Sequence, residues 1–162
     1  MSLSACNAVV NPSFESGVLF PWRASAANVA TVSNADSAYS GEYYLNLQTA
    51  IDNGGNTISQ NLENLKRGTK YDFSAEVQIP GEGASYCLVY VYMGRNETIG
   101  QVATEYVSDF EKWVSVTGSY TPKRSEDRLS IIAACDFEDN SVTGRVYIDD
   151  VIFAPSGSCG SN

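Results

Sequence analysis

Apolar and polar residues alternate along much of the chain, which is the pattern of β-strands that bury one face. In residues 71–78 the alternation is unbroken. The inward set there is Tyr71, Phe73, Ala75 and Val77, and the outward set is Asp72, Ser74, Glu76 and Gln78. Residues 86–92 also alternate, with Cys87, Val89 and Val91 on one face and Tyr86, Leu88, Tyr90 and Tyr92 on the other. We expect each segment to be a strand with one face against a core.

Further segments of this kind recur at even spacing. They are residues 29–32, 43–48, 58–62, 99–106, 113–121, 128–136 and 145–153. Turns rich in Gly, Pro, Asn and Ser separate them, and no segment has a convincing helical period. Nine or ten strands with such turns predict an all-β fold, in which two sheets pack as a jelly-roll β-sandwich.

The tyrosine row of residues 86–92 is the first candidate for a binding site. A hairpin between residues 71–78 and 86–92 would bring the polar outer face of the first strand beside the tyrosines. A tyrosine ring has an apolar face and a polar tip, which suits the C–H faces and hydroxyls of a sugar. The predicted ligand-binding residues are Tyr86, Tyr90, Tyr92, Glu76, Gln78, Asp136 and, at the rim, Arg95. Alternatively, the tyrosines are there only because aromatic residues suit strands.

Length and charge narrow the class of protein. The 162 residues fit a single domain, with residues 1–5 outside its folded part and 156–162 as a tail. Ten basic and nineteen acidic residues give a net charge of −9, which repels nucleic acid and anionic membranes, so we expect neither as a partner. No apolar run approaches the roughly 20 residues of a membrane span. The absence of His argues against His-based catalysis and zinc binding.

Four cysteines have no C-x-x-C spacing and allow three pairings. Their positions favour Cys6 with Cys159, clipping the two ends, and Cys87 with Cys135, joining two strands. The alternative is four buried free thiols in a cytosolic protein. The sequon Asn96-Glu97-Thr98 adds to the case for a secreted, extracellular protein, although residues 1–4 lack the basic and apolar segments of a signal peptide.

Six short motifs occur in a fixed order along nearly the whole chain. They are Asn11-Pro12-Ser13-Phe14-Glu15-Ser16-Gly17 with Pro21-Trp22, Tyr39-Ser40-Gly41, Ile58-Ser59-Gln60, Gly68-Thr69-Lys70-Tyr71-Asp72-Phe73-Ser74-Ala75, Trp113-Val114-Ser115-Val116, and Tyr147-Ile148-Asp149-Asp150-Val151. In this order they resemble the carbohydrate-binding modules of families 4, 9 and 22, which have the galactose-binding-like jelly-roll fold. The cysteines and short loops resemble versions found in secreted fungal proteins.

The resemblance implies a structural calcium ion, since such modules usually hold one where the first and last strands meet. The motifs place its ligands at the Ser13 carbonyl, the Glu15 carboxylate, the Tyr43 carbonyl and the Asp149 carboxylate, with Asp150 as a further candidate. These are the hard oxygen ligands that Ca²⁺ takes. Ser40 departs from the pattern, because some relatives have an acid there, and this should weaken the site. The alternative is that these acids are solvated at strand ends.

Three functions therefore compete. The resemblance implies a non-catalytic module that binds a polysaccharide or oligosaccharide, a β-linked glucan or xylan, on the concave face of a sheet, within a larger secreted protein. A second possibility is an extracellular structural or adhesive domain with no glycan ligand. A third is a glycoside hydrolase that uses an acid pair drawn from Asp72, Glu76 and Asp136. We expect the first, and no enzyme activity.

Overall fold

The structure is a computed structural model that describes residues 6–81 and 83–159. The N-terminal extension predicted at residues 1–5 and the last three residues of the predicted tail lie outside this range. Ten strands make up its regular elements: β1 (Arg23–Ala24), β2 (Ala30–Ser33), β3 (Tyr44–Gln48), β4 (Gly55–Leu62), β5 (Tyr71–Gln78), β6 (Tyr86–Met93), β7 (Gln101–Val107), β8 (Val114–Tyr120), β9 (Asp127–Asp136) and β10 (Arg145–Pro155). The prediction of an all-β fold of nine or ten strands is confirmed.

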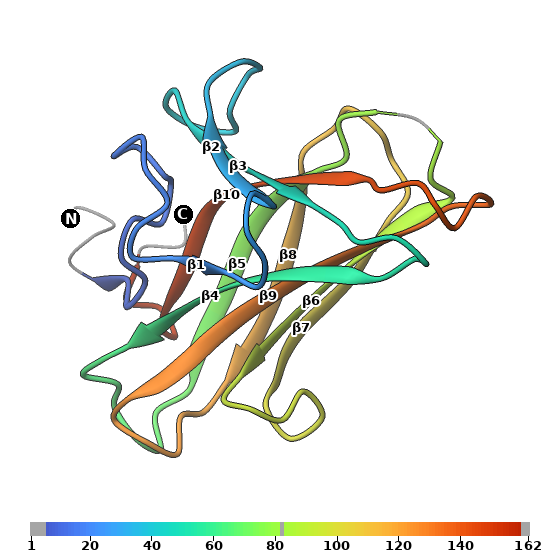
Figure 1. Cartoon of the computed structure of the whole chain (residues 1–162). Helices are drawn as coiled ribbons and strands as arrows, with labels where there is room; N and C mark the ends of the chain where they lie inside the picture. The colour runs from blue at the N-terminus through green and yellow to red at the C-terminus, as the bar shows by residue number, and fades with distance from the viewer. Residues whose placement is uncertain (1–5, 82, 160–162) are drawn as a thin grey trace.

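The strands form two antiparallel five-stranded sheets that pack face to face (Figure 1). Sheet A has the order β1-β4-β9-β6-β7, and sheet B has the order β2-β3-β10-β5-β8. The two longest strands, β9 and β10, occupy the centres of the two sheets. The expected two-sheet sandwich is therefore present.

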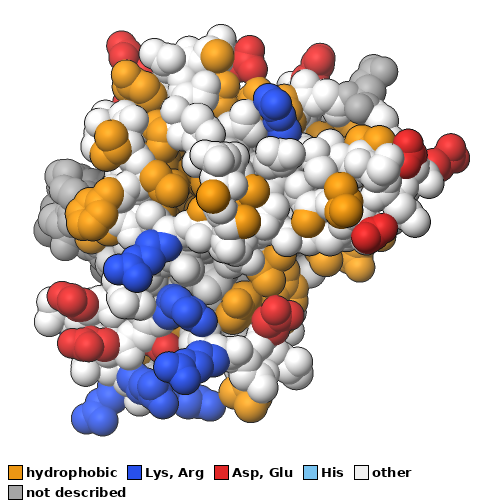
Figure 2. Space-filling model, in the orientation of Figure 1, with side chains coloured by type: hydrophobic (Ala, Val, Ile, Leu, Met, Phe, Trp, Pro, Cys, Tyr) orange, Lys and Arg blue, Asp and Glu red, His pale blue; other side chains and the backbone are white. Residues whose placement is uncertain are grey.

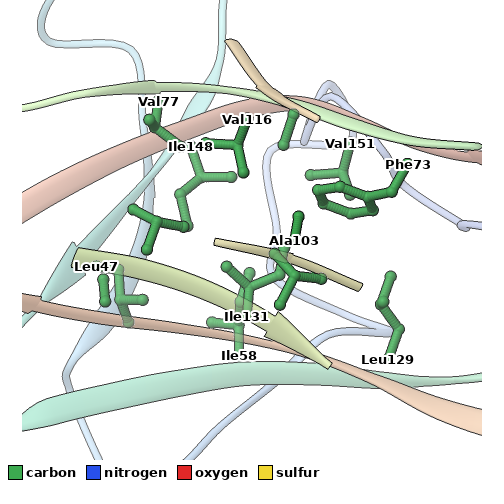
Figure 3. Packing of buried hydrophobic residues seen from close by; sticks show 14 of the residues in the cluster. Leu47, Ile58, Phe73, Val77, Ala103, Val116, Leu129, Ile131, Ile148 and Val151 are labelled. Atoms are coloured by element: carbon green, nitrogen blue, oxygen red, sulfur yellow. The ribbon is translucent and has the colours of Figure 1, made fainter. Parts of the chain in front are cut away.

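The core lies between the sheets and consists of the inward residues of both (Figure 3). Leu47, Val77 and Ile148 of sheet B face Ile58 and Ile131 of sheet A across this layer. All five are fully buried, and truncating such a residue to alanine typically costs about 2–5 kcal/mol of folding free energy. The rigid core fixes the direction of the outward side chains that alternate with it.

The predicted hairpin between residues 71–78 and 86–92 is wrong. β5 pairs with β10 and β8 in sheet B, whereas β6 pairs with β9 and β7 in sheet A. The intervening segment thus crosses from one sheet to the other. Both strands still direct their apolar faces at the same core, so their hydrophobic patterns are the same whether the strands pair edge to edge or pack face to face.

Both predicted disulfides are confirmed. Cys6 and Cys159 join the two ends of the described chain, and Cys87 and Cys135 join β6 to β9. Cys87 and Cys135 are direct register partners, with Cα atoms 4.0 Å apart. This second bridge therefore locks the pairing of β6 with β9, the central strand of sheet A.

Candidate functional site

The outer face of sheet A carries a row of tyrosines along β6, as the alternation predicted. Tyr86, Leu88, Tyr90 and Tyr92 all lie opposite the buried Cys87, Val89 and Val91. Tyr106 of β7, which pairs with Leu88, extends the row sideways. We call these five outward residues (Tyr86, Leu88, Tyr90, Tyr92 and Tyr106) the tyrosine face.

Two pairs of rings organise the tyrosine face. The rings of Tyr86 and Tyr106 lie 5.2 Å apart and are 36% and 64% exposed. The rings of Tyr90 and Tyr92 lie 6.2 Å apart and are half-buried. The Tyr90 hydroxyl donates a 2.6 Å hydrogen bond to the carbonyl of Glu97, which ties the loop after β6 to this face. The face thus presents accessible aromatic surface held by ring contacts and one hydrogen bond.

Smaller side chains lie beside the tyrosines. The outward partners of Leu88, Tyr90 and Tyr92 on β9 are Ala134, Ile132 and Ser130, and those on β4 beyond them are Gly55, Thr57 and Ser59. A Cβ atom at Gly55 would meet the Ile132 side chain at 2.7 Å, so this position has no room for a larger residue. The side chains beside the rings are thus smaller than the rings themselves, and Ser130 among them is buried.

Asp136 lies at one end of this face, where it pairs with Tyr86. Its Oδ1 accepts a 3.1 Å hydrogen bond from the side-chain amide of Asn53. Asn53 in turn accepts a hydrogen bond from the backbone N–H of Phe137 and has a left-handed backbone, with φ at 55°. Asp136 and Asn53 therefore form a fixed polar group at the Tyr86 end of the tyrosine face.

The structure does not gather all seven predicted ligand-binding residues. Tyr86, Tyr90, Tyr92 and Asp136 come together, but Glu76 and Gln78 belong to β5 and lie on the outer face of sheet B. There Glu76 accepts a 2.6 Å hydrogen bond from the Ser115 hydroxyl. The correction follows from the strand order, because β5 and β6 are in different sheets.

Arg95 lies beyond the end of β6, past Tyr92 and far along the strand from Asp136. It lines a hollow between loops at that end of the sandwich. The structure therefore places Arg95 at the end of the tyrosine face opposite Asp136, and its rim role stays a prediction.

The acids considered for hydrolysis do not form a pair. Asp136 is on sheet A, whereas Asp72 and Glu76 are on sheet B. Asp72 and Glu76 are four residues apart on one strand, which separates their Cα atoms by about 13 Å. A retaining or inverting acid pair needs its carboxyl groups roughly 5–9.5 Å apart.

Sequence reasoning missed Tyr106 and Asn53. The inward and outward alternation breaks within β7, because Val102 and Ala103 are both buried next to a register shift opposite Val91 and Tyr92. Tyr106 therefore could not be assigned to a face from parity alone. Asn53 lies in the turn that leads into β4. Asn is common in turns, so its presence there does not indicate a contact with the distant Asp136.

The outer face of sheet B also carries aromatic rings, but they are covered. Tyr44 and Tyr147 pack at 4.4 Å and are 1% and 5% exposed. The Tyr147 hydroxyl donates to Asp36, and burial together with this hydrogen bond raises the pKa of Tyr147. Tyr39 packs edge-on against Trp113 and is the exposed ring of this group. Sheet B therefore does not present an open row of rings.

The residues predicted to bind calcium come from three separated segments that the fold brings together. The Asp150 Oδ1 accepts hydrogen bonds from the hydroxyls of Ser13 and Ser40, at 2.7 and 2.6 Å. The Glu15 carboxylate accepts hydrogen bonds from the backbone N–H groups of Glu42 and Tyr43. The first loop, the segment around residue 40 and β10 thus meet at these acids.

Asp149 is the unusual member of this group. It is fully buried at a bulge of β10, next to Asp150, whose φ is 46°. Its oxygens accept backbone hydrogen bonds from Ser40 and Asp150, at 3.1 and 2.8 Å. Burial raises the pKa of Asp149 to about 7, and the backbone hydrogen bonds oppose that shift. Within the described residues no cationic side chain contacts it.

These residues fit a calcium ion in part. Ca²⁺ takes oxygen ligands, and here a buried carboxylate with no cationic side-chain partner lies near other carboxylate and hydroxyl oxygens. Over residues 6–81 and 83–159, however, no three acidic, histidine or cysteine side chains converge as metal ligands. Any ion bound there would therefore depend on backbone carbonyl oxygens as well as on carboxylates.

The two-sheet sandwich thus carries a row of outward tyrosines on sheet A, and the three acids considered for hydrolysis are divided between the sheets. The chain belongs to the carbohydrate-binding domain family CBM_4_9, whose family model matches residues 6–141. The resemblance drawn from the motifs is thus confirmed, and the family is one of binding domains, as expected of a protein that is not an enzyme.

Several solved structures share the fold of this chain. One is the CBM22-1 xylan-binding domain of Xyn10C from Paenibacillus barcinonensis, with 23% identity and a TM-score of 0.66 over 88% of this chain and 90% of that one. Another is a CBM 22 xylan-binding domain, with 20% identity and a TM-score of 0.68 over 94% and 97%. A third is TmCBM61 in complex with beta-1,4-galactotriose, with 21% identity and a TM-score of 0.66 over 93% and 99%. No curated protein matches the chain.

Proposed function

We propose that the tyrosine face binds a single β-linked glycan chain, a glucan or xylan, without catalysis. The observation that carries the proposal is the row of four outward rings, of which Tyr86 and Tyr106 are exposed and Tyr90 and Tyr92 are half-buried. Sugar rings stack their C–H faces on aromatic rings, while Asp136 and Asn53 offer hydrogen-bonding groups to hydroxyls. The similar folds of two xylan-binding domains and of a module in complex with beta-1,4-galactotriose lend support.

Affinity electrophoresis of the folded protein against a panel of soluble β-glucans, xylans and galactans tests this function. Wild type should be retarded by at least one of them, and Tyr106→Ala should be retarded less. Tyr39→Ala is the matched control, because it removes an exposed tyrosine between β2 and β3, away from the tyrosine face. No retardation by any member of the panel would favour the alternative of a structural or adhesive domain.

We further propose that calcium stabilises the fold at the meeting point of the first loop and β10. The residues that would hold it are Glu15 and Asp149 through carboxylates and Ser13 and Tyr43 through carbonyls, with Asp150 nearby. The ion would neutralise the buried Asp149 carboxylate, which otherwise has no cationic partner in the described chain. Elemental analysis of purified protein, combined with melting curves with and without EDTA, tests this role.

We propose that the protein acts outside the cell, as part of a larger secreted protein. Two disulfides support this location, because such bonds persist in oxidising compartments. No helix in the described part of the chain is long and apolar enough to cross a membrane.

A further inference from the structure

A hollow of about 700 Å³ lies at the end of the sandwich where β6 ends and β9 begins. Four cationic side chains line it, together with the amides of Asn61 and Asn96. The four are Arg95, Lys123, Arg124 and Arg128. None of them takes part in an ion pair or side-chain hydrogen bond within the described chain. Four unpaired cations around one hollow can receive an anionic group.

The hollow continues the tyrosine face. Arg128 and Asn61 are register partners on β9 and β4, two residues beyond Ser130, the residue that pairs with Tyr92. The rise of a strand places the Cα atoms of Arg128 and Ser130 about 7 Å apart. The loop that carries Arg95 is tied to the same face by the hydrogen bond from Tyr90 to Glu97. A chain lying along the tyrosines therefore reaches the cations when it extends past Tyr92.

Charge is unevenly distributed along the molecule. The segments 61–70, 93–100 and 120–128, which form this end, contain seven of the ten basic residues but only four of the nineteen acidic ones. Figure 2 shows most of the visible Lys and Arg side chains at the lower left of the molecule, toward which the ends of β4 and β6 point in Figure 1. Glu63, Glu126 and Asp127 also line the hollow, so four cations face three acids there. In a protein of net charge −9 this end is the favourable one for an anion.

We infer that the basic end of the tyrosine face selects glycans that carry a carboxylate, such as a uronic acid attached to a neutral β-linked backbone. The planar guanidinium groups of Arg95, Arg124 and Arg128 suit bidentate bonding to a carboxylate, and the Asn amides suit the neighbouring hydroxyls. This inference rests on the proposed glycan-binding function. It adds the substrate class, because the tyrosines alone do not distinguish neutral from acidic sugars.

The test compares a xylan that bears glucuronic acid side groups with the same polymer after its carboxyl groups have been reduced to alcohols. The protein is made in a host without N-glycosylation, because the sequon residue Asn96 lines the hollow. We expect wild type to bind the acidic polymer about fivefold or more tightly than the reduced one at low salt, with the preference falling at high salt.

A Lys123→Gln/Arg124→Gln double variant should lose most of this preference and keep its affinity for the reduced polymer. Arg145 lies on sheet B and does not line the hollow, so the control variant Arg145→Gln removes a positive charge and should keep the preference. Equal binding of both polymers by wild type, or an unchanged preference in the double variant, would overturn the inference. If neither polymer binds, the pair of experiments is repeated with a carboxyl-bearing β-glucan and its reduced form, and failure of all four polymers would reject the proposed function itself.

Discussion

Tyr90 offers the sharpest test of the tyrosine face, because its ring and its hydroxyl do different things. The ring packs beside Tyr92 at the centre of the row, and the hydroxyl holds the Glu97 carbonyl at 2.6 Å. Tyr90→Ala removes both, whereas Tyr90→Phe removes the hydroxyl and keeps the ring. The two variants together separate sugar stacking from loop anchoring.

The expected magnitudes follow from these contacts. A central aromatic anchor is worth about 1–3 kcal/mol of binding free energy, so Tyr90→Ala should weaken glycan affinity roughly 5- to 150-fold. Loss of the hydroxyl should cost about 1 kcal/mol of folding free energy in either variant. Because the ring is only half-buried, Tyr90→Ala should cost less stability than the 3–5 kcal/mol typical of a core aromatic residue.

Isothermal titration calorimetry with a soluble oligosaccharide, together with urea unfolding of each variant, measures both quantities. Tyr90→Phe should bind within a few-fold of wild type, because it keeps the stacking surface. Tyr106→Ala, which truncates a ring that is 64% exposed, should weaken binding with little change in unfolding free energy. If the folded Tyr90→Ala and Tyr106→Ala proteins both bind like wild type, the glycan site is not on the tyrosine face.

Three further predictions concern other parts of the chain. Glu76→Ala and Gln78→Ala should leave glycan affinity unchanged, since both lie on sheet B; a tenfold loss in titration calorimetry would contradict the proposed face. EDTA should lower the melting temperature by several degrees, and Glu15→Ala should remove that response; a melt insensitive to EDTA with no calcium by elemental analysis would exclude the ion. In EDTA, the unfolding free energy of wild type relative to Asp149→Asn should fall as the pH rises from about 4 to 7. The reason is that the Asp149 carboxyl keeps its proton in the folded state over this range, whereas it releases the proton in the unfolded chain. Unfolding free energies from urea that change with pH in parallel in the two proteins would contradict this.

Which side chains of a strand point inward and which outward could be predicted, because this depends only on the local alternation of apolar and polar residues. Cys87, Val89 and Val91 are buried and the tyrosines between them point outward, as the pattern required. The sheet to which a strand belongs depends instead on its partners, and β5 and β6 direct the same pattern at the core from opposite sheets. Glu76 and Gln78 were misplaced for this reason, while Asp136 was placed correctly because β9 does pair with β6.

Which face is open also depends on tertiary structure. Sheet B also has two neighbouring outward tyrosines, Tyr44 and Tyr147, but their rings are buried, and the Tyr147 hydroxyl donates a hydrogen bond to Asp36. On sheet A the positions beside Tyr90 and Tyr92 are occupied by Ile132 and Ser130. No local pattern reveals whether a distant loop will cover a row of rings.

The disulfide between Cys87 and Cys135 connects the core to the function of the tyrosine face. These residues form the register pair next to Tyr86 and Asp136, so the covalent bond on the inner side of the sheet fixes the spacing of the aromatic and acidic groups on the outer side. Binding to a surface that is already ordered costs less conformational entropy than binding to a mobile one. Under the proposed function, the bridge therefore serves recognition as well as stability: it holds one end of the tyrosine face in place, while the Tyr90 hydrogen bond to Glu97 positions the basic loop at the other.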